Sequence, residues 1–198
     1  AYSSVSHLGF VVLGIFSFTH EAMQGAVIQM VNHGLSTGAL FLLVGVVYER
    51  THTREISDYG GIAKVVPIFS VAFLFAILSS VGLPGLNGFI GEFLILLGAF
   101  KSPVLNSWWY SIFAASGVIF AAVYLLWMYQ RVVFGELNTN PKLDHLTDMN
   151  ARELIVIIPI FFFIVWIGVY PTTFLNISDA TVSNLINQVL NTPLSVVK

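Results

Sequence analysis

The 198-residue sequence contains no cysteine, which excludes disulfides, thiolate metal sites and iron–sulfur ligation. Charged residues are scarce, at 9% of the chain against about a quarter in a typical soluble domain. The formal net charge is −2 and no basic stripe is present, so nucleic acid is not expected as a partner. Phosphate-binding loops, dinucleotide fingerprints, nucleophile elbows and His-rich metal motifs are also lacking. The sequence therefore predicts no catalytic, cofactor or metal site on this chain.

Hydrophobic residues make up 57% of the chain and occur in long blocks. Because a transmembrane helix needs about 20 mostly apolar residues, the sequence predicts an all-α integral membrane protein. We expect a single membrane domain over residues 1–198 with about five spans. These are placed at about 4–18, 22–48, 66–100, 107–134 and 152–170. A short amphipathic helix is expected at about 178–192, with apolar residues near helical spacing at Ala180, Val182, Leu185, Ile186, Val189 and Leu190.

The positive charges predict how these spans are oriented. Six of the eight Lys and Arg residues fall in loops on one side of the expected membrane: Arg50, Arg54, Lys64, Arg131, Lys142 and Arg152. The other side carries only Lys101 and Lys198. The positive-inside rule then places the first group in the cytoplasm and the C-terminus on the outer side. Since the chain lacks an initiator Met and a basic signal-peptide segment, we expect a fragment whose N-terminal part is missing.

The third span contains residues that break helices, namely Gly82, Pro84, Gly85 and Gly88. A continuous helix over 66–100 would be about 52 Å long, well beyond a bilayer core, so two half-helices joined by an unwound loop fit better. Unwound backbone at membrane depth occurs only inside protein or beside a wet cavity. Glu92 follows the break and lies within a span, whereas the other nine acidic residues lie in loops or at span ends. Such an acid is a candidate for proton transfer, the alternatives being an inert neutral carboxyl and a kink that only assists packing.

The second span carries three polar residues, Gln29, His33 and Thr37, on one helical face. His33 lies near the middle of the span, and histidine titrates near physiological pH. Together with Glu92 it favours a proton relay, the alternative being a neutral histidine that only bonds a neighbouring helix. His7, in the first span or near its end, is a further candidate.

Two more expectations concern helix packing and the end of the second span. Gly34 and Gly38 would let a neighbouring helix approach closely. Glu49 and Arg50 are interpreted as a local pair at the helix end. Neither feature is expected to take part in proton transfer.

Four segments together carry a family resemblance: "AYSSVSHLGFVVLGI", "GAVIQMVNHGLSTGALFLLVGVVYERTHTRE", "GLPGLNGFIGEFLILLGAF" and "AAVYLLWMYQRVVFG". In order and spacing they resemble the subunit M (chain 4) family, antiporter-like membrane subunits of proton-pumping NADH:quinone oxidoreductase, respiratory complex I. The "YERTHTR" and "GEF" segments favour this family over the paralogous subunits L and N, which carry a lysine where this chain has Glu92.

The resemblance implies the last third of a fourteen-helix antiporter-like fold, with the third span here discontinuous. It implies a proton-translocating role for Glu92 at the exit side of a polar axis, with His33 serving the connection toward it and Gln29 and Thr37 as wall or water-binding residues. The family's other key residues, a Glu and two Lys, would lie in the missing part. Implied partners are subunits L and N and the lipid of a bacterial inner membrane. Flavin, iron–sulfur clusters and quinone would reside on partner subunits.

Two other functions stay open. One is a subunit of a multi-chain Na⁺/H⁺ antiporter or a membrane-bound hydrogenase, which share this fold. The other is a structural membrane scaffold in which the polar groups only pack helices. Replacement of Glu92 or His33 would alter stability but not ion movement in a scaffold.

Overall fold

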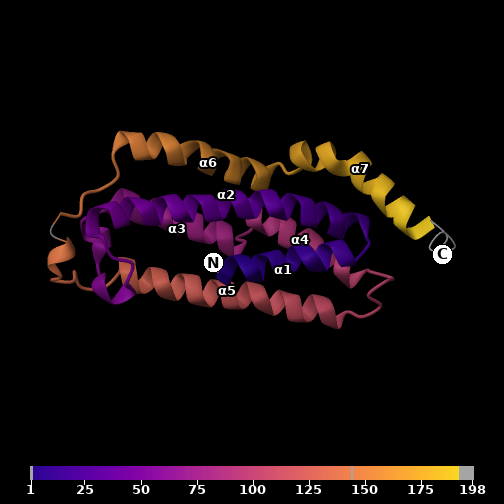
Figure 1. Ribbon diagram of the computed structural model, residues 1–198, viewed down its shortest axis with the longest axis horizontal. Coiled ribbons are helices and arrows are strands. Elements are labelled where there is room, and N and C mark those ends of the chain that lie inside the picture. The colour runs from indigo at the N-terminus through magenta and orange to yellow at the C-terminus, as the bar shows by residue number, and fades with distance from the viewer. Residues whose placement is uncertain (1, 144, 192–198) are drawn as a thin grey trace.

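The computed structural model describes residues 2–143 and 145–191, and within these ranges the chain is helical and has no strands (Figure 1). The predicted all-α fold is thereby confirmed. The α-helices are α1 (Tyr2–Phe16), α2 (His20–Thr51), α3 (Pro67–Val81), α4 (Asn87–Phe100), α5 (Trp109–Val133), α6 (Ala151–Val169) and α7 (Thr172–Asn191). Short 3₁₀ turns lie at Ile56–Asp58, Ile62–Lys64 and Pro141–Leu143.

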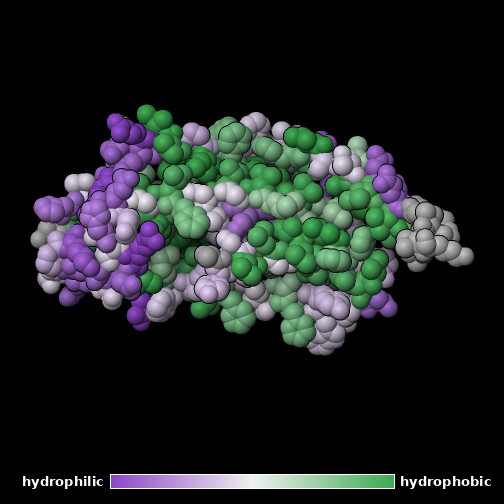
Figure 2. Space-filling view, in the orientation of Figure 1, coloured by the Kyte–Doolittle hydropathy of each residue, from purple (hydrophilic) through white to green (hydrophobic). Residues whose placement is uncertain are grey.

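The longest helix, α2, runs the length of the bundle, and α3 and α4 follow one another along it (Figure 1). Helix α1 packs against α2 and α4, so it covers only the half of the bundle that α4 occupies. Among the described helices, α2, α5 and α6 are long and apolar enough to cross a membrane, while α1, α3 and α4 are shorter apolar helices. Hydrophilic side chains gather at one end of the molecule (Figure 2). The chain is therefore a multi-pass membrane bundle.

The predicted interruption of the third span is also confirmed. Helix α3 ends at Val81 and α4 begins at Asn87. Gly82 and Gly85 adopt φ angles of 82° and 94°, in the left-handed region that glycine enters without steric penalty. Pro84 lies between them and cannot donate a backbone hydrogen bond. Neither half-helix is long enough to cross a bilayer alone, so the break lies well inside the bundle.

Helices α2 and α4 pack closely, because glycines on α4 leave room for the backbone and side chains of α2. A Cβ at Gly91 would lie 2.2 Å from Gln29 Oε1, and one at Gly98 would lie 2.4 Å from the Ala22 nitrogen. The predicted close approach at Gly34 and Gly38 is wrong, since a Cβ at either would meet nothing within 4 Å in the described part of the chain. The inward face of α2 is set by its buried polar residues, and these two glycines lie on another face.

Helix α7 begins at Thr172, six residues before the amphipathic helix expected at 178–192, whose last residue lies outside the described ranges. Pro171 directly precedes α7, and its carbonyl accepts the first hydrogen bonds of the helix, from the nitrogens of Phe174 and Leu175. Of the expected apolar face, Val182 is buried and Ile186 is half-buried, whereas the other four are exposed: Ala180, Leu185, Val189 and Leu190.

Candidate functional site

Glu92 lies on α4 about one and a half turns after the break, and its side chain is buried. Its Oε1 is 3.0 Å from His7 Nδ1 on α1 and accepts a hydrogen bond of 3.3 Å from Gln29 Nε2 on α2. Its second oxygen faces the break, where a Cβ on Gly82 would lie 3.0 Å from Oε2. The interruption of the helix therefore provides the space that the carboxylate occupies.

His7 and Glu92 form a hydrogen-bonded pair whose side chains are each only 5% exposed. An unpaired buried carboxylate costs several kcal/mol, so the contact with an imidazole has a clear electrostatic reason. One proton can lie on either partner, as imidazolium beside carboxylate or as imidazole beside carboxylic acid. Both arrangements leave the pair neutral, and loss of that proton leaves one negative charge inside the bundle.

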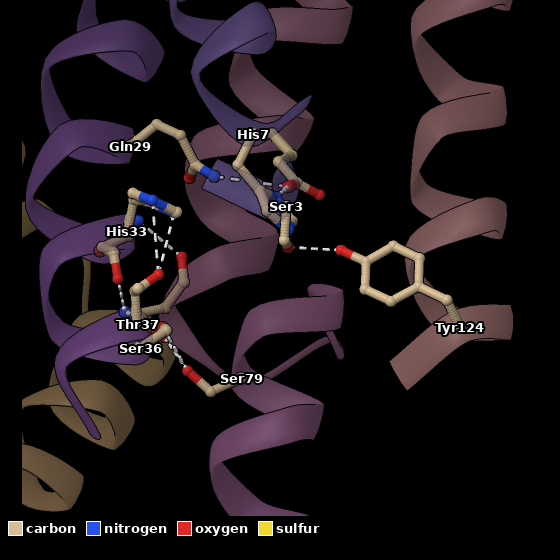
Figure 3. A network of polar contacts seen from close by, with 11 residues as sticks. Ser3, His7, Gln29, His33, Ser36, Thr37, Ser79 and Tyr124 are labelled. Atoms are coloured by element: carbon tan, nitrogen blue, oxygen red, sulfur yellow. Dashed lines mark hydrogen bonds and ion pairs between the residues drawn. The ribbon is translucent and has the colours of Figure 1, made fainter. Parts of the chain in front are cut away.

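His33 lies one step further from the carboxylate. Its ring centroid is 5.6 Å from that of His7, and its Nδ1 is 3.2 Å from Thr37 Oγ1 (Figure 3). Thr37 is its hydrogen-bond partner within the described ranges. The order of the groups is therefore Glu92, His7, His33 and Thr37, with Gln29 contacting Glu92 from the side.

A second polar network, missed by sequence reasoning, joins α2 to both half-helices. Asn32 Nδ2 donates to the Asn87 carbonyl at 2.7 Å, and Asn87 Nδ2 donates to the Asn32 carbonyl at 3.2 Å. Asn87 Oδ1 accepts from Ser79 Oγ at 2.6 Å, and Ser79 Oγ lies 2.7 Å from Ser36 Oγ. This network holds the end of α3 and the start of α4 against one surface of α2. A signal was present in the sequence, because two asparagines in apolar spans need buried partners.

A third contact connects α5 to the site. Ser3, one turn before His7 on α1, forms a hydrogen bond with the Tyr124 hydroxyl of α5 (Figure 3). Sequence reasoning missed this pair too, since tyrosine is common near membrane interfaces and carries no spacing signal here.

A small pocket lined mostly by buried residues lies between the two main networks, with room for about one water molecule. His7, Gln29, Asn32, His33, Ser36, Ser79, Ser80 and Gly88 line it. In the described part of the chain, no cluster of three His, Asp or Glu residues is arranged to hold a metal ion. The site is thus a set of neutral polar groups around one acid and two imidazoles, which suits the transfer of protons.

Known proteins resemble this chain in sequence and in fold. The chain is 46% identical over 186 residues to NADH-quinone oxidoreductase subunit M of Rickettsia conorii, covering 94% of this chain and 37% of that protein. The chain thus spans about a third of the length of such relatives. Respiratory complex I from Thermus thermophilus with bound NADH contains a chain with a TM-score of 0.81 and 36% identity, covering 93% of this chain and 38% of that one.

The fold also occurs in the Mrp complex from Dietzia sp. DQ12-45-1b, with a TM-score of 0.82, 18% identity and coverage of 94% and 42%. The family model described as NADH:quinone oxidoreductase/Mrp antiporter, TM, matches residues 1–119, which include α1, α2 and the broken pair α3 and α4. This chain therefore belongs to the NADH:quinone oxidoreductase/Mrp antiporter membrane-subunit family.

Proposed function

We propose that this chain is part of a proton-translocating membrane-arm subunit of NADH:quinone oxidoreductase. The observation that carries the proposal is the buried pair of Glu92 and His7 beside a broken helix. A carboxylate placed there takes up and releases a proton as nearby charges change. The family membership and the 46% identity to relatives named subunit M support this reading over other membrane functions.

In this mechanism Glu92 accepts a proton and passes it on, with His7 as its immediate partner. His33 and Thr37 extend the path by one step, and Gln29 orients the carboxylate. Electron transfer on partner subunits, which hold the flavin, iron–sulfur clusters and quinone, supplies the driving force. The chain itself performs no redox chemistry and binds no cofactor.

The proposed setting is a bacterial inner membrane, with neighbouring antiporter-like subunits L and N as partners. The end of the bundle formed by residues 52–66, 134–143 and 145–150, here termed the loop end, is proposed to face the cytoplasm. Three of the eight basic residues lie in these loops, at Arg54, Lys64 and Lys142, and three more on the helix ends beside them, at Arg50, Arg131 and Arg152. The C-terminal helix α7 then lies toward the opposite side (Figure 1).

The test is Glu92→Gln in the assembled complex. Glutamine keeps the shape of the side chain and cannot titrate, so proton translocation per electron is expected to fall while the subunit still assembles. The matched control is Glu21→Gln, which removes an exposed acid at the start of α2. Normal translocation by the Glu92→Gln complex would contradict the proposal.

A second candidate is a subunit of a multi-chain Na⁺/H⁺ antiporter, because the family and the Mrp fold include such complexes. Purification of the native complex separates the two functions. A peripheral arm with flavin and iron–sulfur clusters supports the oxidoreductase, whereas sodium-dependent proton movement without that arm supports the antiporter. If Glu92→Gln and His33→Ala changed only stability, the chain would be a scaffold.

A further inference from the structure

Three buried polar atoms have no hydrogen-bond partner in the described part of the chain: His7 Nε2, Gln29 Oε1 and Asn32 Oδ1. All three residues line the small pocket between the networks. A buried polar atom without a partner has lost its bonds to water and gained none in return, so a ligand that bonds to it stabilises the fold. Because the three come from two different helices and share one pocket, they indicate a common hydrogen-bonding ligand.

The two amide oxygens cannot turn away from their present positions without loss. Gln29 uses its Nε2 to donate to Glu92, and Asn32 uses its Nδ2 to donate to the Asn87 carbonyl. Flipping either amide would place an oxygen against another acceptor. The ligand must therefore donate to two fixed acceptors.

Water fits these requirements. The pocket has room for about one molecule, and water supplies the two donors. A sodium ion would be less suited, because the third atom is an imidazole nitrogen and hard cations prefer oxygen ligands.

We propose that a water in this pocket donates to Gln29 Oε1 and Asn32 Oδ1 and accepts a hydrogen bond from His7 Nε2–H, which stabilises the proton-loaded state of the His7–Glu92 pair. With both of its protons engaged, this water has only lone pairs to offer His7. A proton on Nε2 occurs in both loaded arrangements, either imidazolium beside carboxylate or Nε2–H imidazole accepting at Nδ1 from the Glu92 carboxyl. In the unloaded pair, Nδ1–H donates to the carboxylate and the bare Nε2 faces the water oxygen. Gln29 and Asn32 thereby select the loaded state, an inference that rests on the proposed function.

Other titratable groups near the pair are few. His33 faces His7 from α2, and Tyr124 of α5 is bonded to Ser3, one turn from His7. Helix α3 has no titratable side chain, and the charged residues of α6 lie at its start, where Glu153 pairs with Arg50. A change in pH dependence therefore reports chiefly on the pair and on His33.

The experiment compares Asn32→Leu with Asn87→Leu in the purified, assembled complex reconstituted in vesicles. Each variant removes one of the two reciprocal bonds, because both bonds run from a side-chain amide to a backbone carbonyl. Only Asn32→Leu removes an unpartnered oxygen of a residue that lines the pocket. Proton translocation per electron is measured against pH. The alkaline limb is expected to move to lower pH by about one unit in Asn32→Leu, equivalent to one hydrogen bond, and to stay in place in Asn87→Leu. Equal shifts in both variants, or no shift in Asn32→Leu, would overturn the proposal.

Asn32→Ala removes the same oxygen with less steric change and replaces Asn32→Leu if that variant fails to assemble. Infrared difference spectra in H₂¹⁸O give a second readout, since the bound water predicts an isotope-sensitive band that Asn32 variants lose. A wild-type pH limb that moves with sodium at constant ionic strength would indicate a cation instead and overturn the assignment to water. Failure of the proposed function is distinct, because it would appear as full translocation by Glu92→Gln while the isotope-sensitive band persists.

Discussion

The loop end and the middle of the bundle both contain polar groups, but they differ in how fully those groups are bonded. On the helix ends beside the loop end, Arg50 Nη2 lies 2.9 Å from Glu153 Oε1, and Arg50 Nη1 donates to the Val46 carbonyl. The Asp148 carboxylate accepts from two backbone nitrogens at the start of α3, at 2.8 and 2.9 Å. Lys142 reaches Asp58 at 2.8 Å.

The middle of the bundle is less completely bonded. There the Glu92 carboxylate contacts one imidazole, that of His7, and three buried polar atoms lack hydrogen-bond partners within the described ranges. Complete bonding stabilises a single arrangement, whereas spare bonding capacity leaves room for a proton and a water to change places. The loop end therefore has the character of a structural cluster and the middle that of a working site.

The largest effect is expected from a substitution that forces the two half-helices, α3 and α4, apart. In Gly88→Ala the new Cβ would lie 2.2 Å from the Ser79 carbonyl oxygen, which is backbone and cannot move aside. Overpacking of this kind costs roughly 1–3 kcal/mol or more, so we expect loss of the assembled subunit. Gly38→Ala is the control, since its Cβ meets nothing within 4 Å among the described residues. Assembly is measured by native gel and thermal midpoint, and equal midpoints would contradict the close approach.

Histidine variants sharpen the comparison within the site. His7 contacts Glu92 directly, whereas His33 is separated from the carboxylate by His7. We expect His7→Gln to slow proton translocation about as much as Glu92→Gln does, because a positioned acid or base contributes about 10²–10⁴-fold to a rate. We expect His33→Gln to slow proton translocation several-fold less. Proton uptake per electron in vesicles is the measurement. A larger loss of proton translocation in His33→Gln than in His7→Gln would contradict the order Glu92, His7, His33 that the geometry indicates.

Beside the loop end, Arg50→Met is expected to lower the stability of the subunit without changing the number of protons translocated per electron. It leaves the Glu153 carboxylate, whose side chain is 15% exposed, without its cation. A partly buried pair broken in this way loses about 2–3 kcal/mol, somewhat less than a fully buried one. Lys101→Met is the control, because its contact with Glu21 is 3.8 Å long and exposed, and such pairs contribute at most about 1 kcal/mol. Thermal midpoints test the first expectation, and an altered proton-to-electron ratio in the surviving Arg50→Met complex would contradict the second.

Sequence reasoning predicted the architecture because hydrophobic blocks and helix breakers act locally. The break at residues 82–86 follows from Gly82, Pro84 and Gly85 alone, and a lone acid in an apolar span indicates a buried partner. The identity of that partner depends on which helix lies beside α4, and this is a property of tertiary packing. Sequence reasoning favoured His33 as the relay residue with Glu92 and gave His7 as a further candidate, whereas the structure brings His7 to the carboxylate.

The same limit explains two wrong expectations. Gly34 and Gly38 form a motif typical of close helix contacts. The close contact between α2 and α4 is instead made at Gly91 and Gly98 of α4. Glu49 is adjacent to Arg50 in sequence, but successive helix residues point in different directions, and Arg50 reaches Glu153 across the bundle instead. Spacing shows which residues share a face, and only packing decides which face is inward.

The smallest expected effect concerns pH at the loop end. Hydrogen bonds from Lys142 and Thr53 hold the pKa of the Asp58 carboxyl below its usual value of 3.8. A lowered folded pKa means that the contribution is present above the unfolded value and is lost as pH falls through the folded one. Asp58→Asn should therefore increase hydrogen exchange in residues 52–66 slightly at neutral pH and abolish the acid-dependent increase below about pH 4. Lys142→Met should reproduce the neutral-pH change. An unchanged acid profile in Asp58→Asn would assign that profile to another carboxylate, with Glu55 of the same segment and Asp148, which accepts from two backbone nitrogens at the start of α3, as the candidates.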